Sequence, residues 1–365
     1  MTSKRAILYI AVTVLVLASG CRQAYISQQR DEARQRWAVS RAEMVTKLAE
    51  GCYQRGEIGR AQQHLDEVIN SGAPYAPLYT LAARMAADKG NLDGARTFAE
   101  NAKAIDPKSA EARYVLGTVE QMLGGQADRA LEEYSEASRL DPAQSKYVLA
   151  EAEMRVAAGQ ADQAAQSLAD AAGRMPGRTE VHAALGDVLA RLNRHADAAA
   201  SYRTALRLEP DRPDIKERLA IALFSSGAYV EAEAALAELA PLGPDFATQW
   251  VQGMRGNCLI ALRRLPEARA LYQTLAHAQP DSAAPLVGLA KCDILDHRLP
   301  AAKALLEQAL ARSPRHAEAN ALLGGILMTE DKPAEATPHL ALALEDPKFA
   351  DRASAERLLA RVQGK

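Results

Sequence analysis

Nine prolines divide most of this chain into segments of nearly equal length. They are Pro74, Pro107, Pro142, Pro176, Pro210, Pro244, Pro280, Pro314 and Pro347, spaced at a nearly constant interval. Nine alanines, from Ala61 to Ala336, keep the same interval, and each lies about a third of a segment before one of the prolines. A fixed interval of roughly 20–50 residues is the signature of a repeat architecture. The chain is therefore expected to be an array of one repeated unit.

The composition indicates that the repeated unit is helical. Hydrophobic residues make up 48% of the chain, only 5% is aromatic, and alanine, the best helix former, is frequent. A third series, always Gly or Ala, falls a further third of a segment before each periodic alanine. Small residues at regular positions let two helices approach closely, so we expect each unit to be a tightly packed pair of helices and the fold to be all-α.

Charge and motifs exclude several functions. The formal net charge of −2 gives no basic footprint for nucleic acid, and four cysteines in 365 residues are no disulfide scaffold. The sequence contains no GxGxxG, GxxxxGK, HExxH, GxSxG or CxxC motif, and its seven histidines show no metal-ligand spacing. We therefore expect no catalytic residues, no metal and no cofactor.

The repeats resemble the tetratricopeptide repeat. The residues that match its pattern throughout one repeat are Leu185, Gly186, Ala198, Tyr202, Ala205 and Pro210. The resemblance implies a right-handed α-solenoid of about nine helical hairpins over residues 42–348. Residues 349–365 remain and are expected to form a C-terminal capping helix.

The N-terminus has the features of an export signal. Lys4 and Arg5 precede an uncharged run from Ala6 to Ala18, which is too short to span a membrane. The small residues before Cys21 resemble the lipobox of bacterial lipoproteins, although Ala18 stands where that pattern usually has Leu. The resemblance implies removal of residues 1–20 and lipidation of Cys21, and Arg22 favours the outer membrane over the inner. An ordinary signal cut near Gly20, or an uncleaved short anchor, is the alternative.

Residues 21–41 are expected to form a basic helical spacer. They contain five arginines against two acidic residues, without Pro or Gly. This segment either holds the folded part off the membrane as a solvated spacer or contacts anionic headgroups beside the lipid anchor.

In tetratricopeptide repeats the first helix of each hairpin lines a concave groove. Its inward positions are mostly polar in repeats 1 to 5 and mostly apolar in repeats 6 to 9. The predicted peptide-binding residues are Ile221, Phe224, Trp250, Asn257, Ile260, Val287, Lys291, Ile294 and Met328. Trp250 would anchor an apolar peptide or helix, and Asn257 and Lys291 would fix its backbone or terminal carboxylate. Alternatively, Trp250 packs under the insertion at residues 245–248.

Three further cysteines have two interpretations. Cys52, Cys258 and Cys292 are buried thiols, or Cys258 and Cys292, which occupy equivalent positions in adjacent repeats, form a bridge in an oxidising compartment.

These features predict a membrane-anchored periplasmic scaffold. It would bind envelope proteins or peptides in the concave groove, and a membrane through the Cys21 lipid. The resemblance to tetratricopeptide lipoproteins implies a place in an assembly, secretion, pilus or polysaccharide-export system. The alternative is a carrier or sensor that holds a small molecule, lipid or glycan in the same groove. No nucleic-acid partner is expected, and the sequence does not determine the oligomeric state.

Overall fold

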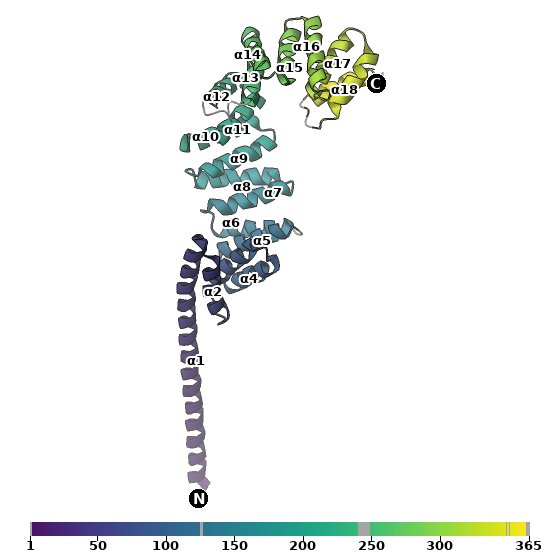
Figure 1. Ribbon diagram of the computed structural model, residues 1–365. Helices are drawn as coiled ribbons and strands as arrows, with labels where there is room; N and C mark the ends of the chain where they lie inside the picture. Colours follow the sequence, from purple (N-terminus) through teal and green to yellow (C-terminus); the bar gives the residue numbers. More distant parts are fainter. Residues whose placement is uncertain (1, 125–126, 240–248, 348, 350, 363–365) are drawn as a thin grey trace. The chain divides into compact units, whose positions relative to one another are not determined.

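The computed structural model describes residues 2–124, 127–239, 249–347, 349 and 351–362, without the side chains of residues 2–26 and 249. Over these residues the chain forms 19 helices and no strands (Figure 1). It divides into two compact units, residues 1–176 and residues 177–365. This confirms the all-α solenoid that the repeat pattern predicts.

Unit 1 consists of four stacked hairpins. Its helices are α1 (Thr2–Gln54), α2 (Ile58–Ile69), α3 (Ala76–Asp88), α4 (Leu92–Ile105), α5 (Ala110–Leu123), α6 (Ala127–Leu140), α7 (Ser145–Ala157) and α8 (Ala161–Arg174). Each odd-numbered helix packs against the helix that follows it, and each hairpin packs against the next. The helix α1 runs without a break from the predicted signal, through the predicted spacer, into the first hairpin.

Unit 2 continues the same pattern with five hairpins and a final helix. Its helices are α9 (Thr179–Arg191), α10 (His195–Leu208), α11 (Pro213–Ser225), α12 (Tyr229–Leu239), α13 (Gln249–Ala261), α14 (Leu265–Ala278), α15 (Ala284–Leu295), α16 (Leu299–Arg312), α17 (Ala317–Thr329), α18 (Pro333–Leu344) and α19 (Arg352–Val362). The last helix, α19, packs against both α17 and α18. Among the described residues, no helix is both long and apolar enough to cross a lipid bilayer.

One turn geometry recurs within the hairpins. The second residue before the second helix has a positive φ at Gly56, Gly90, Gly159, Gly227, Asn193, Arg263, His297 and Asp331. The left-handed conformation ends the first helix and redirects the chain into the second. Four of these residues are not glycine, although side chains are disfavoured in this region.

The periodic small residues lie where the two helices of a hairpin touch. All nine periodic alanines of the second helices, from Ala61 to Ala336, are fully buried. Where the first helix has Gly, the second presents a large side chain, so a Cβ built on Gly186 would lie 2.5 Å from Tyr202. The third periodic series is therefore set by helix contact, as the sequence predicts.

Candidate functional site

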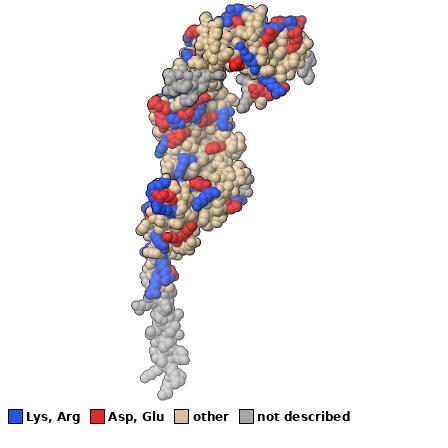
Figure 2. All heavy atoms as spheres, in the orientation of Figure 1, with Lys and Arg blue, Asp and Glu red and all other residues tan. Residues whose placement is uncertain are grey.

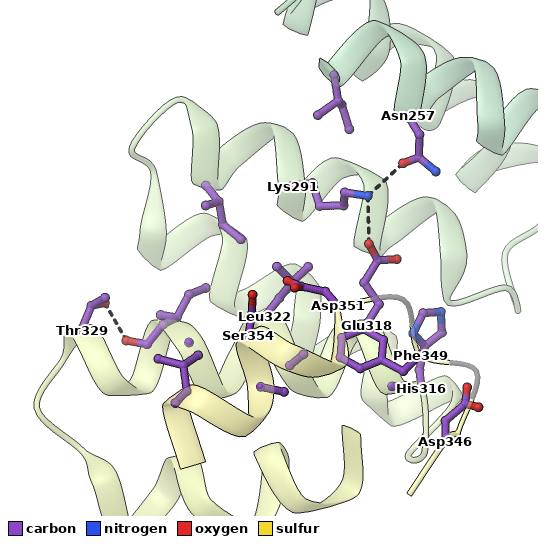
Figure 3. Close-up of a pocket in the computed structure, with 18 of the residues that line it drawn as sticks. Asn257, Lys291, His316, Glu318, Leu322, Thr329, Asp346, Phe349, Asp351 and Ser354 are labelled. Atoms are coloured by element: carbon purple, nitrogen blue, oxygen red, sulfur yellow. Dashed lines mark hydrogen bonds and ion pairs between the residues drawn. The ribbon is translucent and has the colours of Figure 1, made fainter. Parts of the chain in front are cut away.

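A groove of about 930 Å³ lies in unit 2 (Figure 3). Four first helices of hairpins, α11, α13, α15 and α17, contribute to its lining, and α19 contributes a further wall. Its apolar lining includes Phe224, Ile260, Ile294, Leu322, Phe349 and Leu358. A concave, mostly apolar hollow with a few polar groups is the usual form of a binding site.

Helical spacing explains why these side chains converge. Asn257 and Ile260 on α13 are three residues apart, as are Lys291 and Ile294 on α15. Residues with this spacing share a face of a helix. On α17, positions 318, 322, 325 and 329 form one stripe toward the groove. Parallel stripes on neighbouring first helices therefore form one continuous lining.

A polar network crosses the groove (Figure 3). The Lys291 Nζ donates hydrogen bonds to Asn257 Oδ1 at 2.9 Å and to Glu318 Oε1 at 2.8 Å. The Tyr272 hydroxyl lies 3.1 Å from the same Asn257 oxygen and 3.0 Å from the Gly253 carbonyl oxygen. Since Glu318 already balances the charge of Lys291, a ligand carboxylate would compete with Glu318 for this ammonium.

The start of α17 carries a second polar feature of the groove. His316 is the N-cap, and its Nδ1 accepts a hydrogen bond from the Ala319 backbone N–H at 3.3 Å. Nδ1 of His316 is therefore the hydrogen-bond acceptor in this contact. The contact also holds the imidazole in the groove lining beside Glu318.

The structure brings together five of the nine predicted peptide-binding residues. Phe224, Asn257, Ile260, Lys291 and Ile294 all line the groove. Whether any of them contacts a partner stays a prediction.

The other four predicted residues lie outside the groove lining. Ile221 and Trp250 are 40% and 39% exposed, and Ile221 lines a separate hollow beside Tyr202. Met328 is half-buried against the core of unit 2, and Val287 is only 1% exposed within that core. Val287 is therefore a packing residue in this structure. The alternative prediction packs Trp250 under the insertion at residues 245–248. These residues lie outside the described part of the chain.

Sequence reasoning missed the groove residues Glu318, Leu322, Phe349 and Leu358. Glu318 lies in the first turn of α17, and its charge gave no reason to expect it in a mostly apolar groove. Phe349 and Leu358 follow the last repeat, so no periodicity could place them against the groove.

Unit 1 has a smaller and more polar hollow of about 400 Å³. Its lining includes Tyr53, Arg84, Glu111, Tyr114 and Lys146. Lys146 pairs with Glu111 and lies 5.2 Å from the centre of the Tyr114 ring. Lys146 and Glu111 thus balance each other's charge within this hollow.

Cys52, Cys258 and Cys292 are free, buried thiols. Burial, reinforced by the nearby Glu233 carboxylate, raises the pKa of Cys258 to about 11. Burial also raises the pKa of Cys292. No group of three or more His, Cys, Asp or Glu side chains within the described chain is arranged to hold a metal ion.

We expect Cys258 to react with iodoacetamide at pH 8 at least about a hundredfold more slowly in the folded protein than in urea, because only the thiolate is nucleophilic. The raised folded-state pKa also means that its contribution to stability is present below about pH 9 and is lost as the pH rises toward about 11. Mass-spectrometric labelling rates test this, and equal rates in both states would contradict it.

The sequence of unit 2 identifies the repeat. Residues 183–245 and 296–361 match the family model described as tetratricopeptide repeat. The tetratricopeptide repeat thus covers these two segments of unit 2. Tetratricopeptide repeat proteins are in general non-catalytic scaffolds that bind peptides or proteins in a groove.

Solved structures of similar fold include the Naa15/Naa10 complex bound to HypK-THB, at 18% identity and a TM-score of 0.48, covering 89% of this chain and 51% of that chain. This chain thus spans about half the length of that protein. Others are YrrB, a tetratricopeptide repeat protein with an unusual peptide-binding site (19% identity, TM-score 0.42, 50% and 93% coverage), and pilF of Pseudomonas aeruginosa (22% identity, TM-score 0.43, 57% and 94% coverage). A search of curated proteins finds no significant match.

Proposed function

We propose that this protein is a lipid-anchored periplasmic scaffold whose unit 2 groove binds an apolar peptide segment or helix of other envelope proteins. The observation that carries the proposal is the groove of about 930 Å³, in which four first helices and α19 surround an apolar lining crossed by one polar network. The system it serves would be envelope assembly, secretion, pilus formation or polysaccharide export.

The groove offers a peptide two kinds of contact. Ile260, Ile294 and Leu322 provide apolar surface, and each apolar side chain of a partner buried there contributes about 1.5–3 kcal/mol. Lys291 and Glu318 place a donor and an acceptor side by side. A backbone carbonyl and amide of a bound peptide could therefore be satisfied together without leaving either charge unpaired.

Native mass spectrometry of the lipidated protein, captured from detergent-solubilised envelopes, tests this function against that of a carrier. The scaffold proposal expects bound polypeptides that leave when a charge is placed in the groove. A bound small molecule of constant mass, without polypeptide, would favour the carrier of a small molecule, lipid or glycan.

The membrane anchor rests on the lipobox resemblance at Cys21, whose side chain lies outside the described residues. The N-terminal peptide of the mature protein is expected to begin at Cys21 and to carry acyl chains, which provide stable anchoring because each buried CH₂ contributes about 0.8 kcal/mol.

Mass spectrometry of that peptide measures the anchor directly. The Cys21→Ser variant should lose the acyl mass, whereas the matched Cys52→Ser variant should keep it because Cys52 is a buried residue of the first hairpin. An unmodified Cys21 in the wild-type protein would contradict the anchor without touching the groove.

A further inference from the structure

The first hairpin exposes a row of large apolar side chains along α1. Trp37, Met44 and Leu48 are 65%, 73% and 50% exposed. Positions i, i+7 and i+11 lie on one face of a helix. The buried residues Ala42 and Ala49 lie on a different face, where they pack with α2 and α3. The row is therefore no part of the core of unit 1.

Arginines accompany this row. The Arg41 guanidinium lies 5.7 Å from the centre of the Trp37 ring. We call Trp37, Arg41, Met44 and Leu48 the Trp37 stripe. Arg30 and Arg34 are exposed on the preceding turns of α1. Figure 2 shows Lys and Arg side chains gathered on α1 directly beyond the residues drawn in grey.

The acids near these arginines neutralise them only weakly. Arg34 lies 3.5 Å from Asp31, Arg36 lies 3.3 Å from Glu32, and Arg41 lies 3.9 Å from Glu67, and each of these six side chains is at least 40% exposed. Ion pairs of this kind contribute little and exchange readily for other partners. Residues 22–41 keep an excess of arginine, five against two acids.

We propose that the Trp37 stripe binds the surface of a bilayer that contains anionic lipids. Helices that lie in a membrane interface combine an apolar face with flanking Lys or Arg, and tryptophan favours the boundary between headgroups and acyl chains. The inference rests on the membrane location in the proposed function. The same continuous helix carries Cys21 and the stripe, so the anchor would bring the stripe to the lipid.

Charge favours lipid over a second copy of the chain as the occupant. A symmetric pairing of two stripes would bring Arg41 and its neighbouring arginines close to their counterparts, and like charges that meet in an interface oppose association. Phosphate headgroups offer the opposite sign. Each arginine near an anionic surface contributes about 1 kcal/mol, which is about fivefold in a binding equilibrium.

The chain has only two tryptophans, so the Trp250→Phe variant reports on Trp37 alone. The full-length lipidated protein is reconstituted in vesicles of phosphatidylethanolamine and phosphatidylglycerol, with some lipids brominated on their acyl chains. The proposal expects Trp37 emission to shift to the blue and to be quenched by bromine. Adding Arg41→Gln should lower the ratio of docked to undocked stripe about fivefold. Adding Met44→Glu and Leu48→Glu should abolish quenching. The control Val230→Glu changes an exposed side chain of α12 and should leave quenching unchanged.

Two results would overturn the proposal. One is Trp37 emission and acrylamide access that are the same with and without vesicles. The other is a blue-shifted Trp37 without vesicles together with a doubled mass in light scattering, which would assign the stripe to a second copy. A missing lipid anchor can be told apart from a stripe that does not bind lipid, because mass spectrometry of the N-terminal peptide measures the acylation of Cys21 independently. An acylated protein with unquenched Trp37 contradicts the stripe alone.

Discussion

The Gly256→Ala variant is expected to lose about 1–3 kcal/mol of free energy of unfolding, the usual effect of forcing an extra methyl into a packed core. A Cβ on Gly256 would lie 2.4 Å from Tyr272 Cζ. Tyr272 is buried, and the other side of its ring packs against α15, where a Cβ built on Gly288 would lie 2.4 Å from the ring. The ring therefore has no free space into which it could move. Tyr272 thus fills the narrow space between two neighbouring hairpins.

Gly253→Ala provides the matched control on the same helix, since a Cβ there meets nothing within 4 Å. Alanine favours the helix over glycine by about 1 kcal/mol, so this variant should be neutral or more stable. Urea unfolding followed by circular dichroism measures both. Equal midpoints for the two variants would mean that the small residue of the first helix is not set by contact with Tyr272.

The double variant Ile294→Glu and Leu322→Glu is expected to weaken partner binding more than tenfold. Each side chain lines the groove from a different first helix. Their replacement removes apolar contact worth about 1.5–3 kcal/mol per side chain and forces a carboxylate to lose water when the partner docks.

Gln308→Glu adds one negative charge, half of the charge that the double variant adds, on the exposed surface of α16 away from the groove lining, and should leave binding unchanged. The bound fraction of each captured polypeptide is measured by quantitative mass spectrometry, with circular dichroism confirming the fold. Equal loss in the double variant and in the control would show a general charge effect. No loss in either would place the binding surface elsewhere.

The architecture could be predicted from the sequence because each hairpin must satisfy the same contacts. The two helices of each hairpin touch at Ala61 and its eight equivalents, and at the small residues opposite them. Because a larger side chain would push the helices apart, small residues recur there at the repeat interval. The turn geometry was less visible. Glycine occupies the left-handed position at Gly56, Gly90 and Gly159 in unit 1 and at Gly227 in unit 2, but the other four hairpins of unit 2 have Asn193, Arg263, His297 and Asp331 there. Four different residue types at one position give no recognisable sequence motif for this turn.

The groove could be predicted only in part. Inward positions counted along each first helix identified Asn257, Lys291 and Ile294. Val287 shares a face of α15 with Lys291 and Ile294, but it lies a full turn before Lys291 and is covered by the core of unit 2, so a shared face does not ensure access to the groove. The pairing of Lys291 with Glu318 depends on the distance between α15 and α17, which no single repeat encodes. The position of α19 against α17 has no periodic partner in the sequence at all.

Site-specific photo-crosslinking tests the groove most directly. The photoreactive residue p-benzoylphenylalanine replaces Leu322 in the groove or Gln308 on α16, in the full-length protein in living cells. After irradiation, mass spectrometry of the crosslinked peptides identifies the partner segment. The account predicts crosslinks from position 322 to an apolar segment of an envelope protein, lost in the presence of Ile294→Glu, and none of that segment from position 308. Crosslinks of the same segment from both positions, or crosslinks from 322 that persist with Ile294→Glu, would contradict it.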